Sequence, residues 1–206
     1  MSDINFDKNN SCLLTIDFQN DFVLPDGSAY IPGSEDVIEN IASIVSVYRL
    51  KNRPIIHVIR IYQPDGSNAE LCRKGIIKKS GGIVSPNTRG INIVQKIIGE
   101  RTIDLNIDIL LNKQFQKIND NEWIMYKPRW GAFYNTDLES FLRSKGINSI
   151  LISGCNYPNC PRATIYEASE RDFKIGIISN SISGIYPQGI EELKSIGVTI
   201  LTLNDL

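Results

Sequence analysis

Histidine and cysteine are scarce in this chain of 206 residues, which contains one histidine and four cysteines. The cysteines form no Cys-x-x-Cys pair, so the sequence supports neither a zinc site nor a disulfide framework. We therefore expect no metal and no cofactor. Free thiols are typical of a reducing compartment, and we expect the protein to be cytoplasmic.

An excess of charge of either sign is also lacking, and so are long apolar runs. The 22 basic and 23 acidic residues leave a net charge of -1, which argues against a nucleic-acid partner. No apolar run is long enough to cross a bilayer, and residues 1–10 lack the basic and apolar stretches of a secretory signal, so we expect no membrane partner. A small-molecule ligand fits this composition better.

No linker rich in proline, glycine or serine divides the sequence, and we interpret residues 1–206 as one domain. Apolar runs alternate with amphipathic segments, which is typical of a three-layer α/β/α fold with a mainly parallel sheet. We expect six strands, at residues 12–16, 54–59, 123–126, 149–153, 174–178 and 198–203. We expect helices at residues 35–50, 136–144, 163–173 and 189–195.

The segment between residues 83 and 122 has a weaker pattern. Residues 91–98 fit a helix, whereas residues 103–112 fit an extra strand, a helix or an insertion. In parallel sheets the ligand site lies at the carboxyl ends of the strands. The polar residues at those ends are therefore the candidates for function.

Cys160 lies where a predicted buried strand passes into a helix, and it is the candidate nucleophile. The strand at residues 149–153 ends at Gly154, and Pro161 suits the first helical position, so Cys160 falls at or next to the N-cap. Unpaired backbone N–H groups at the positive end of the helix dipole favour a thiolate there. Most cysteines are buried filler instead. We interpret the remaining three in that way: Cys12, Cys72 and Cys155.

Two more polar residues follow predicted strands directly. Asp17 follows the first strand, and its carboxylate could take a proton from the thiol and return it to a leaving amine. Lys127 follows the third strand, and its ammonium could stabilise the neighbouring anions. The alternative for Asp17 is a loop-closing Asx-turn, and the alternative for Lys127 is a solvated loop lysine.

The single histidine, His57, lies inside an apolar run, and we interpret it as a core histidine with satisfied hydrogen bonds. A Cys-His mechanism therefore has no obvious base. Aromatic residues after Lys127 could form a wall of a pocket or simply pack in the core. These are Trp130, Phe133 and Tyr134.

The segments at residues 17–22, 127–133 and 154–160, in this order, resemble those of the isochorismatase-like cysteine hydrolase superfamily. The resemblance implies a catalytic triad of Asp17, Lys127 and Cys160, and the strand order 3-2-1-4-5-6. It also implies a cis peptide between Cys155 and Asn156, with the amides of Asn156 and Cys160 as oxyanion-hole donors. Members commonly assemble as homodimers or homotetramers. We predict substrate contacts at five residues: Gln19, Phe22, Trp130, Phe133 and Tyr157.

The chain departs from two branches of that superfamily. Nicotinamidase-like members carry an aspartate-histidine metal cluster after the second strand, but residues 60–68 here contain no histidine. True isochorismatases lack a cysteine at the position of Cys160. The segment at residues 64–71 and the Arg-Trp-Gly-Ala-Phe run resemble the N-carbamoyl amidase branch more closely.

These features together predict a hydrolase of a C–N bond in a small amide or ureido compound, acting through a thioester on Cys160. The alternative from a different class is a catalytically silent protein of the same fold that binds a ligand or forms oligomers. A Rossmann-type cofactor binder fits less well, because no Gly-x-Gly-x-x-Gly turn follows the first strand. Selective alkylation of Cys160 near neutral pH would favour the enzyme.

Overall fold

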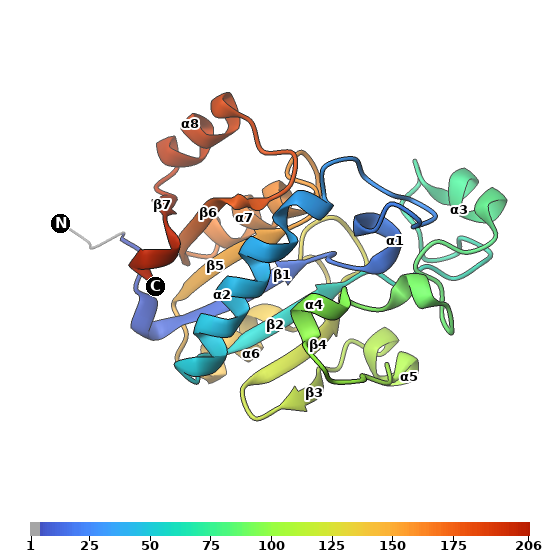
Figure 1. Cartoon of the computed structure of the whole chain (residues 1–206), viewed down its shortest axis with the longest axis horizontal. Helices are drawn as coiled ribbons and strands as arrows, with labels where there is room; N and C mark the ends of the chain where they lie inside the picture. Colours follow the sequence, from blue (N-terminus) through green and yellow to red (C-terminus); the bar gives the residue numbers. More distant parts are fainter. Residues whose placement is uncertain (1–4) are drawn as a thin grey trace.

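One sheet of seven strands runs through the described part of this computed structural model, residues 5–206 (Figure 1). Its strands lie side by side in the order β3-β4-β2-β1-β5-β6-β7. Every pair is parallel except β3 with β4. The strands are β1 (Ser11–Ile16), β2 (Ile55–Ile59), β3 (Gln116–Asn119), β4 (Glu122–Tyr126), β5 (Ser149–Gly154), β6 (Lys174–Ile182) and β7 (Thr199–Leu201).

The α/β class is as predicted, but the prediction of six strands is wrong because β3 is an additional strand. It pairs antiparallel with β4 at the edge of the sheet. Its four residues, Gln-Lys-Ile-Asn, are half-buried or exposed, so they lack the apolar run that marks the other strands. The six parallel strands, numbered along the chain without β3, run 3-2-1-4-5-6.

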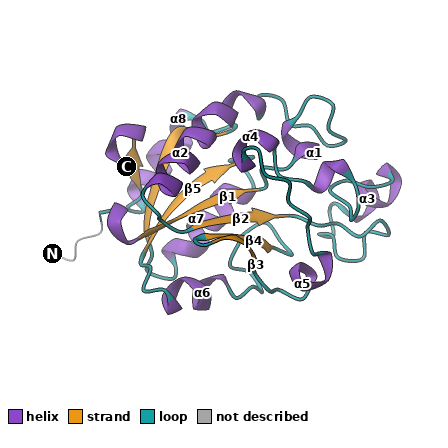
Figure 2. Ribbon diagram, turned by 60° about the horizontal axis from the view of Figure 1, so that its bottom comes forward, coloured by secondary structure: helices purple, strands orange, loops and turns teal. Residues whose placement is uncertain are grey.

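Helices cover both faces of the sheet, as Figure 2 shows. Helices α2 and α4 pack on one face, and helices α6, α7 and α8 pack on the other. The described helices are α1 (Asn20–Val23), α2 (Ile38–Leu50), α3 (Lys74–Ser80), α4 (Gln95–Ile98), α5 (Ile107–Leu111), α6 (Leu138–Ser144), α7 (Cys160–Ser169) and α8 (Pro187–Ser195). Short 3-10 turns occur at Lys8–Asn10, Glu35–Val37, Arg89–Ile91 and Leu203–Asp205.

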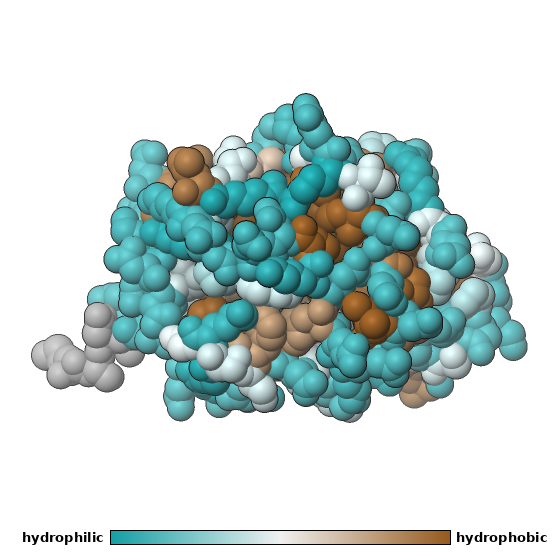
Figure 3. All heavy atoms as spheres, turned by 90° about the horizontal axis from the view of Figure 1, so that it is seen from below, coloured by the Kyte–Doolittle hydropathy of each residue, from teal (hydrophilic) through white to brown (hydrophobic). Residues whose placement is uncertain are grey.

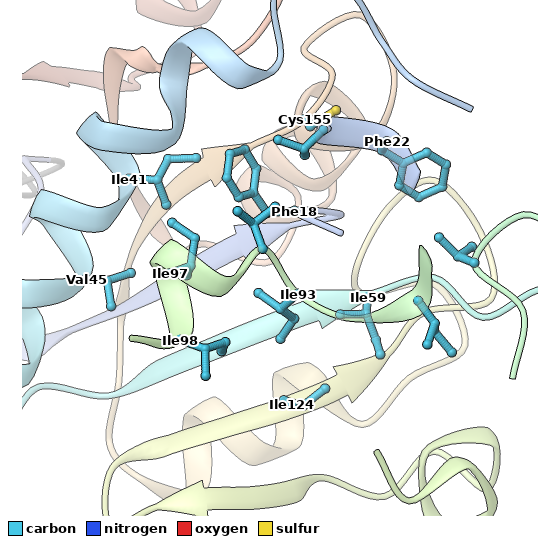
Figure 4. Packing of buried hydrophobic residues seen from close by; sticks show 14 of the residues in the cluster. Phe18, Phe22, Ile41, Val45, Ile59, Ile93, Ile97, Ile98, Ile124 and Cys155 are labelled. Atoms are coloured by element: carbon cyan, nitrogen blue, oxygen red, sulfur yellow. The ribbon is translucent and has the colours of Figure 1, made fainter. Parts of the chain in front are cut away.

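Successive side chains of each strand point to opposite faces of the sheet, and this alternation divides the core into two hydrophobic clusters. In β1, Leu13 belongs to the cluster under α2 and α4, whereas Leu14 belongs to the cluster under α6 and α7. Burying one such side chain contributes about 1.5–3 kcal/mol. Figure 4 shows the first cluster, in which Phe22 and Cys155 lie beyond Phe18. This cluster therefore reaches the residues that follow β1 and β5.

Several predicted boundaries moved. The helix expected at residues 163–173 begins at Cys160 and ends at Ser169, because Pro161 is accommodated in its first turn. Residues 107–111 form a helix, α5, within the segment left open between three alternatives. The short helices α1 and α3 were not expected, since neither offers two full turns of apolar periodicity.

The outer surface is mainly hydrophilic. Figure 3 shows the face beside β3, where hydrophobic residues are visible in hollows between polar ones. Among residues 5–206, none of the helices combines the length and the apolar character needed to span a membrane. The first four residues of the segment inspected for a secretory signal lie outside the described part.

Candidate active site

The carboxyl ends of β4, β1 and β5 bring Lys127, Asp17 and Cys160 to one edge of the sheet. Asp17 follows β1, and its N–H donates to the carbonyl of Val58 at 2.8 Å. Lys127 follows β4, and its N–H donates to the carbonyl of Ile59 at 3.0 Å. Cys160 begins α7 after β5. Because β2 lies between β1 and β4, the lysine side chain has to reach across the end of β2.

Gly154 lets the end of β5 approach β1 closely. A Cβ atom at this position would lie 2.3 Å from the carbonyl oxygen of Ile16, and the glycine has a φ of +131°. The next N–H, that of Cys155, donates to the same oxygen at 2.9 Å. The peptide between Cys155 and Asn156 is cis, as the resemblance implies. The chain then turns into α7 directly beside Asp17.

Asp17 and Lys127 form a buried ion pair, with 2.9 Å between Nζ and Oδ2. Lys127 also donates from Nζ to the carbonyl of Arg129 at 3.1 Å. The alternative of a solvated loop lysine is therefore wrong. The other carboxylate oxygen of Asp17, Oδ1, is buried and has no hydrogen-bond partner among the described residues. Asp17 also has a φ of +51°, a conformation that side-chain-bearing residues adopt mainly where the surroundings enforce it.

The thiol of Cys160 is buried and protonated near neutral pH. Burial, followed by the negative charge of Asp17, raises its pKa to about 12, against smaller opposing effects of Lys127 and Arg60. The expectation that the helix N-terminus favours a thiolate therefore runs against the direction of the shift, since burial and the charge of Asp17 raise the pKa of this thiol. Rapid alkylation near neutral pH is consequently a poor criterion for the activity of this protein.

A small pocket with an empty volume of about 240 Å³ opens over this cluster. In the described chain, neither the N–H of Asn156 nor that of Cys160 donates a hydrogen bond. Two free backbone donors beside a nucleophile match the requirement of an oxyanion hole. The lining residues are Asp17, Phe22, Ile31, Arg73, Cys155, Asn156, Asn159 and Cys160.

Two of the five predicted substrate contacts lie at this pocket or beside it. Phe22, on α1, is part of the lining. Trp130 is partly buried, and the guanidinium of Arg73, another lining residue, lies 5.1 Å from the centroid of its ring. Trp130 therefore supports the wall of the pocket through Arg73.

The other three predicted contacts serve the framework. Gln19 is fully buried and donates to the carbonyls of Arg60 and Ile91 at 2.9 and 2.8 Å. Tyr157 is fully buried and donates from its hydroxyl to the carbonyl of Gly189 at 3.1 Å. Phe133 packs against Phe173 with 5.6 Å between ring centroids. None of the three lines the pocket, because these interactions direct each side chain into the core.

The remaining cysteines differ from one another. Cys12 is fully buried in the core, as expected of a filler residue. Cys155 is also buried and belongs to the first hydrophobic cluster, as expected of a filler residue, although it lines the pocket as well. Cys72 is exposed, so its interpretation as core filler is wrong. Cys72 and Cys155 both lie in loops at the carboxyl edge of the sheet, where burial does not follow strand periodicity.

Arg60 fixes the loop that carries Lys127. Its guanidinium donates to the carbonyls of Lys127 and Arg129 at 2.9 and 3.0 Å, and it pairs with Glu70 at 2.7 Å. Sequence reasoning missed both Arg60 and the pocket residue Arg73. The available signal was their place in the loop that follows β2, since loops at this edge of a parallel sheet surround the ligand.

The side chains after β2 do not fit the metal cluster of nicotinamidase-like proteins. Arg60 and Arg73 are cations, and the carboxylate of Glu70 is already occupied by Arg60 and by the hydroxyl of Tyr62 at 2.9 Å. His57 lies elsewhere, in the middle of β2, where Thr15 and Glu122 bond its two ring nitrogens at 2.7 and 2.8 Å. Residues 5–206 contain no group of three potential metal ligands.

Comparison with known families gives a match along nearly the whole chain. The sequence model of the Isochorismatase domain matches residues 11–103 and 108–205. A solved isochorismatase family protein from Desulfovibrio vulgaris superimposes with a TM-score of 0.80 at 28% identity, covering 95% of both chains.

Two named proteins are also similar to this chain in sequence. A probable inactive nicotinamidase of Arabidopsis thaliana is 27% identical over 201 residues, which are 95% of this chain and 94% of that protein. The ureidoacrylate amidohydrolase RutB of Methylorubrum extorquens is 24% identical over 204 residues, covering 92% of this chain and 76% of that protein.

Proposed function

This chain belongs to the isochorismatase family, and on that premise we propose that it is a cysteine-dependent hydrolase of a C–N bond in a small amide or ureido compound. One observation carries the proposal. Asp17, whose Oδ1 is unpartnered, and Cys160, whose thiol has a raised pKa, line the same pocket, and so does Asn156, whose backbone N–H is free like that of Cys160. A proton acceptor, a nucleophile and oxyanion donors are thereby combined.

The first half-reaction begins with the neutral thiol. Asp17 Oδ1 takes the proton of Cys160 as the sulfur attacks the carbonyl carbon, and the carbonyl oxygen becomes an oxyanion held by the amides of Asn156 and Cys160. Lys127 pairs with Oδ2, which leaves Oδ1 as the oxygen that takes the proton. The raised pKa of the thiol requires this transfer to accompany the attack.

The remaining steps complete the acylation by releasing the amine and then hydrolyse the thioester, which returns the site to its starting state. Asp17 gives its proton to the leaving nitrogen, the C–N bond breaks, and ammonia or an amine departs from a thioester on Cys160. Asp17 then removes a proton from water as the water attacks the thioester. The sulfur leaves and recovers a proton from Asp17, so that the Asp17 carboxylate and the Cys160 thiol are regenerated.

The ureido part of the proposal is supported by RutB, a relative named as a ureidoacrylate amidohydrolase. The alternative, a catalytically silent protein that binds a ligand or forms oligomers, is supported by the Arabidopsis relative, which is named as probably inactive. The two differ in whether a substrate carbon becomes attached to Cys160.

Trapping that attachment tests the proposal. A panel of small amides and ureido compounds is screened for ammonia release, and reactions with positive compounds are quenched in acid and analysed by peptide mass spectrometry. We expect an acyl adduct on Cys160, with no turnover by Cys160→Ala and retained turnover by Cys155→Ala, the matched cysteine control. Full activity of Cys160→Ala would exclude the mechanism. Absence of turnover across the panel, with ligand-induced stabilisation, would favour the silent protein.

Assembly and location remain predictions. A homodimer or homotetramer is expected from the family, and light scattering during size-exclusion chromatography measures it. Cytoplasmic location is expected from the four free thiols, and fractionation of host cells checks it.

A further inference from the structure

Arg73 is the positively charged residue of the pocket that no carboxylate neutralises. It precedes α3 and lines the pocket together with Asp17 and Cys160. Within the described residues it forms no ion pair, and it hydrogen-bonds through its side chain only to the hydroxyl of Tyr62, at 3.3 Å from Nη1. Its guanidinium carbon, Cζ, lies over the ring of Trp130, 5.1 Å from the ring centroid. Nε and Nη2 are left available to an incoming group.

The other charges at the site are already compensated. Lys127 is paired with Asp17, and Arg60 is paired with Glu70 while donating to two carbonyls. Glu70 has no oxygen left for Arg73, since its Oε2 accepts from Tyr62. An uncharged substrate would therefore leave one half-buried guanidinium facing the pocket without a counter-ion.

We propose that Arg73 binds a carboxylate of the substrate, which makes the substrate a short amide acid or ureido acid. This inference rests on the proposed function and narrows its substrate class. A guanidinium presents planar, paired N–H donors that match the two oxygens of a carboxylate, and the contact with the ring of Trp130 restrains the position of this guanidinium. The small volume of the pocket limits the carboxylate to a few bonds from the scissile carbonyl at Cys160.

A pair of alkylating reagents tests this binding without any turnover. Iodoacetate and iodoacetamide share a leaving group and differ in carrying a carboxylate or an amide. The rate of modification of Cys160 by each is measured by peptide mass spectrometry at pH 9. The rate with iodoacetate is divided by the rate with iodoacetamide, and this ratio is then divided by the same ratio measured for the thiol of glutathione. We expect a normalised ratio of about ten in the wild type, because Arg73 holds the carboxylate reagent next to the sulfur.

Variants assign that preference to Arg73. Arg73→Gln should bring the normalised ratio to about one, and Arg73→Lys should retain part of the preference because it keeps the charge and loses the fork. Lys74→Gln is the matched control, since it removes one charge from the neighbouring exposed position, and it should keep the wild-type ratio. A normalised ratio near one in the wild type, or an unchanged ratio in folded Arg73→Gln, would overturn the proposal.

A second pair of probes separates this inference from the proposed function. Ammonia release is measured with succinamate, which carries a carboxylate, and with succinamide, its neutral counterpart. We expect kcat/KM to favour succinamate at least tenfold in the wild type, and Arg73→Gln to remove this preference mainly through KM. Equal use of both compounds overturns the carboxylate contact and leaves the hydrolase intact. A clear iodoacetate preference without ammonia release supports the carboxylate contact and counts against the hydrolase.

Discussion

Strand β4 has a buried ionic cluster at each end, and the two clusters differ in a way that bears on function. At its first residue, Glu122 accepts hydrogen bonds from Arg49, Arg101 and His57 at 2.6–3.1 Å. We call these four residues the Glu122 network. Just beyond its last residue, Lys127 pairs with Asp17 next to Cys160. Both clusters remove a carboxylate from water.

The Glu122 network is saturated, whereas the Asp17 cluster is not. Both oxygens of Glu122 are bonded, and although burial alone would raise its pKa, the bonds from His57, Arg49 and Arg101 hold that pKa well below its usual value. Asp17 instead keeps Oδ1 unpartnered and faces a pocket. Burial of charge alone therefore does not distinguish the candidate site from the Glu122 network, whereas an unsatisfied acceptor on a residue that lines a cavity does.

The largest expected effect comes from the nucleophile. Cys160→Ala should lower kcat/KM by more than about 10³-fold, because no thioester can form. Cys155→Ala removes a thiol from the same pocket and should retain most of the activity. Steady-state ammonia release with the best substrate of the panel measures both. Comparable losses in the two variants would mean that the pocket, rather than one sulfur, carries the reaction.

Asp17→Asn should have opposite effects on two reactions of the same thiol. Hydrolysis should slow by about 10²–10³-fold, because the proton acceptor is lost. Alkylation of Cys160 by iodoacetamide at pH 8 should become faster, because removal of the negative charge lowers the pKa of the thiol from about 12 while Lys127 stays in place. Stopped assays of ammonia and of adduct formation check the two rates. Slower alkylation would show that Asp17 does not hold the thiol neutral.

Glu122→Gln probes the saturated cluster. It should lower the free energy of unfolding by about 2–3 kcal/mol, because two arginines and His57 lose their charged acceptor. Near neutral pH, kcat should stay within about twofold, since none of these residues reaches the pocket. Urea unfolding measures the stability change. The matched control is Glu39→Gln, which breaks the exposed pair with Lys96 and should cost less than about 0.5 kcal/mol.

The smallest expected effect is a pH dependence from His57. Burial lowers the pKa of His57, although the bond to Glu122 opposes this, so the folded protein binds the histidine proton more weakly than the unfolded chain does. The corresponding stability is present above about pH 6.5 and is lost as the pH falls below that value. The stability gap between wild type and His57→Gln should therefore narrow by about 1 kcal/mol from pH 7.5 to 5.5. Urea unfolding at both values checks this, and a widening gap would contradict it.

Strand ends were the part of the fold that could be predicted best. Buried parallel strands are continuous apolar runs, such as the one that contains Ile150, Leu151 and Ile152. The polar residues that follow such runs lie at the strand ends, and this pattern located Asp17, Lys127 and Cys160. Strand β3 was not predicted because most of its residues are polar. Its hydrogen bonds to β4, rather than burial of its side chains, hold it in the sheet.

The pocket wall could be predicted less well. Gln19 and Tyr157 lie next to the site in sequence, yet their side chains turn into the framework, because buried carbonyls on distant segments accept their hydrogen bonds. Arg73 lies 87 positions before Cys160, in a loop whose path no local pattern defines. The protonation state of the Cys160 thiol could not be predicted from the sequence either, since its pKa depends on burial and on the charge of Asp17.

The contacts of Arg60 distinguish the loop that holds Lys127 from the side chains that line the pocket. Its guanidinium donates to two carbonyls of the Lys127 loop, whereas Phe22, Ile31 and Arg73 line the pocket and, in the described chain, form no hydrogen bond with that loop. Substitutions at these three positions can therefore retarget the enzyme to differently shaped or charged amides while the reacting groups keep their places. The scaffold is in this respect a convenient starting point for directed changes of substrate preference.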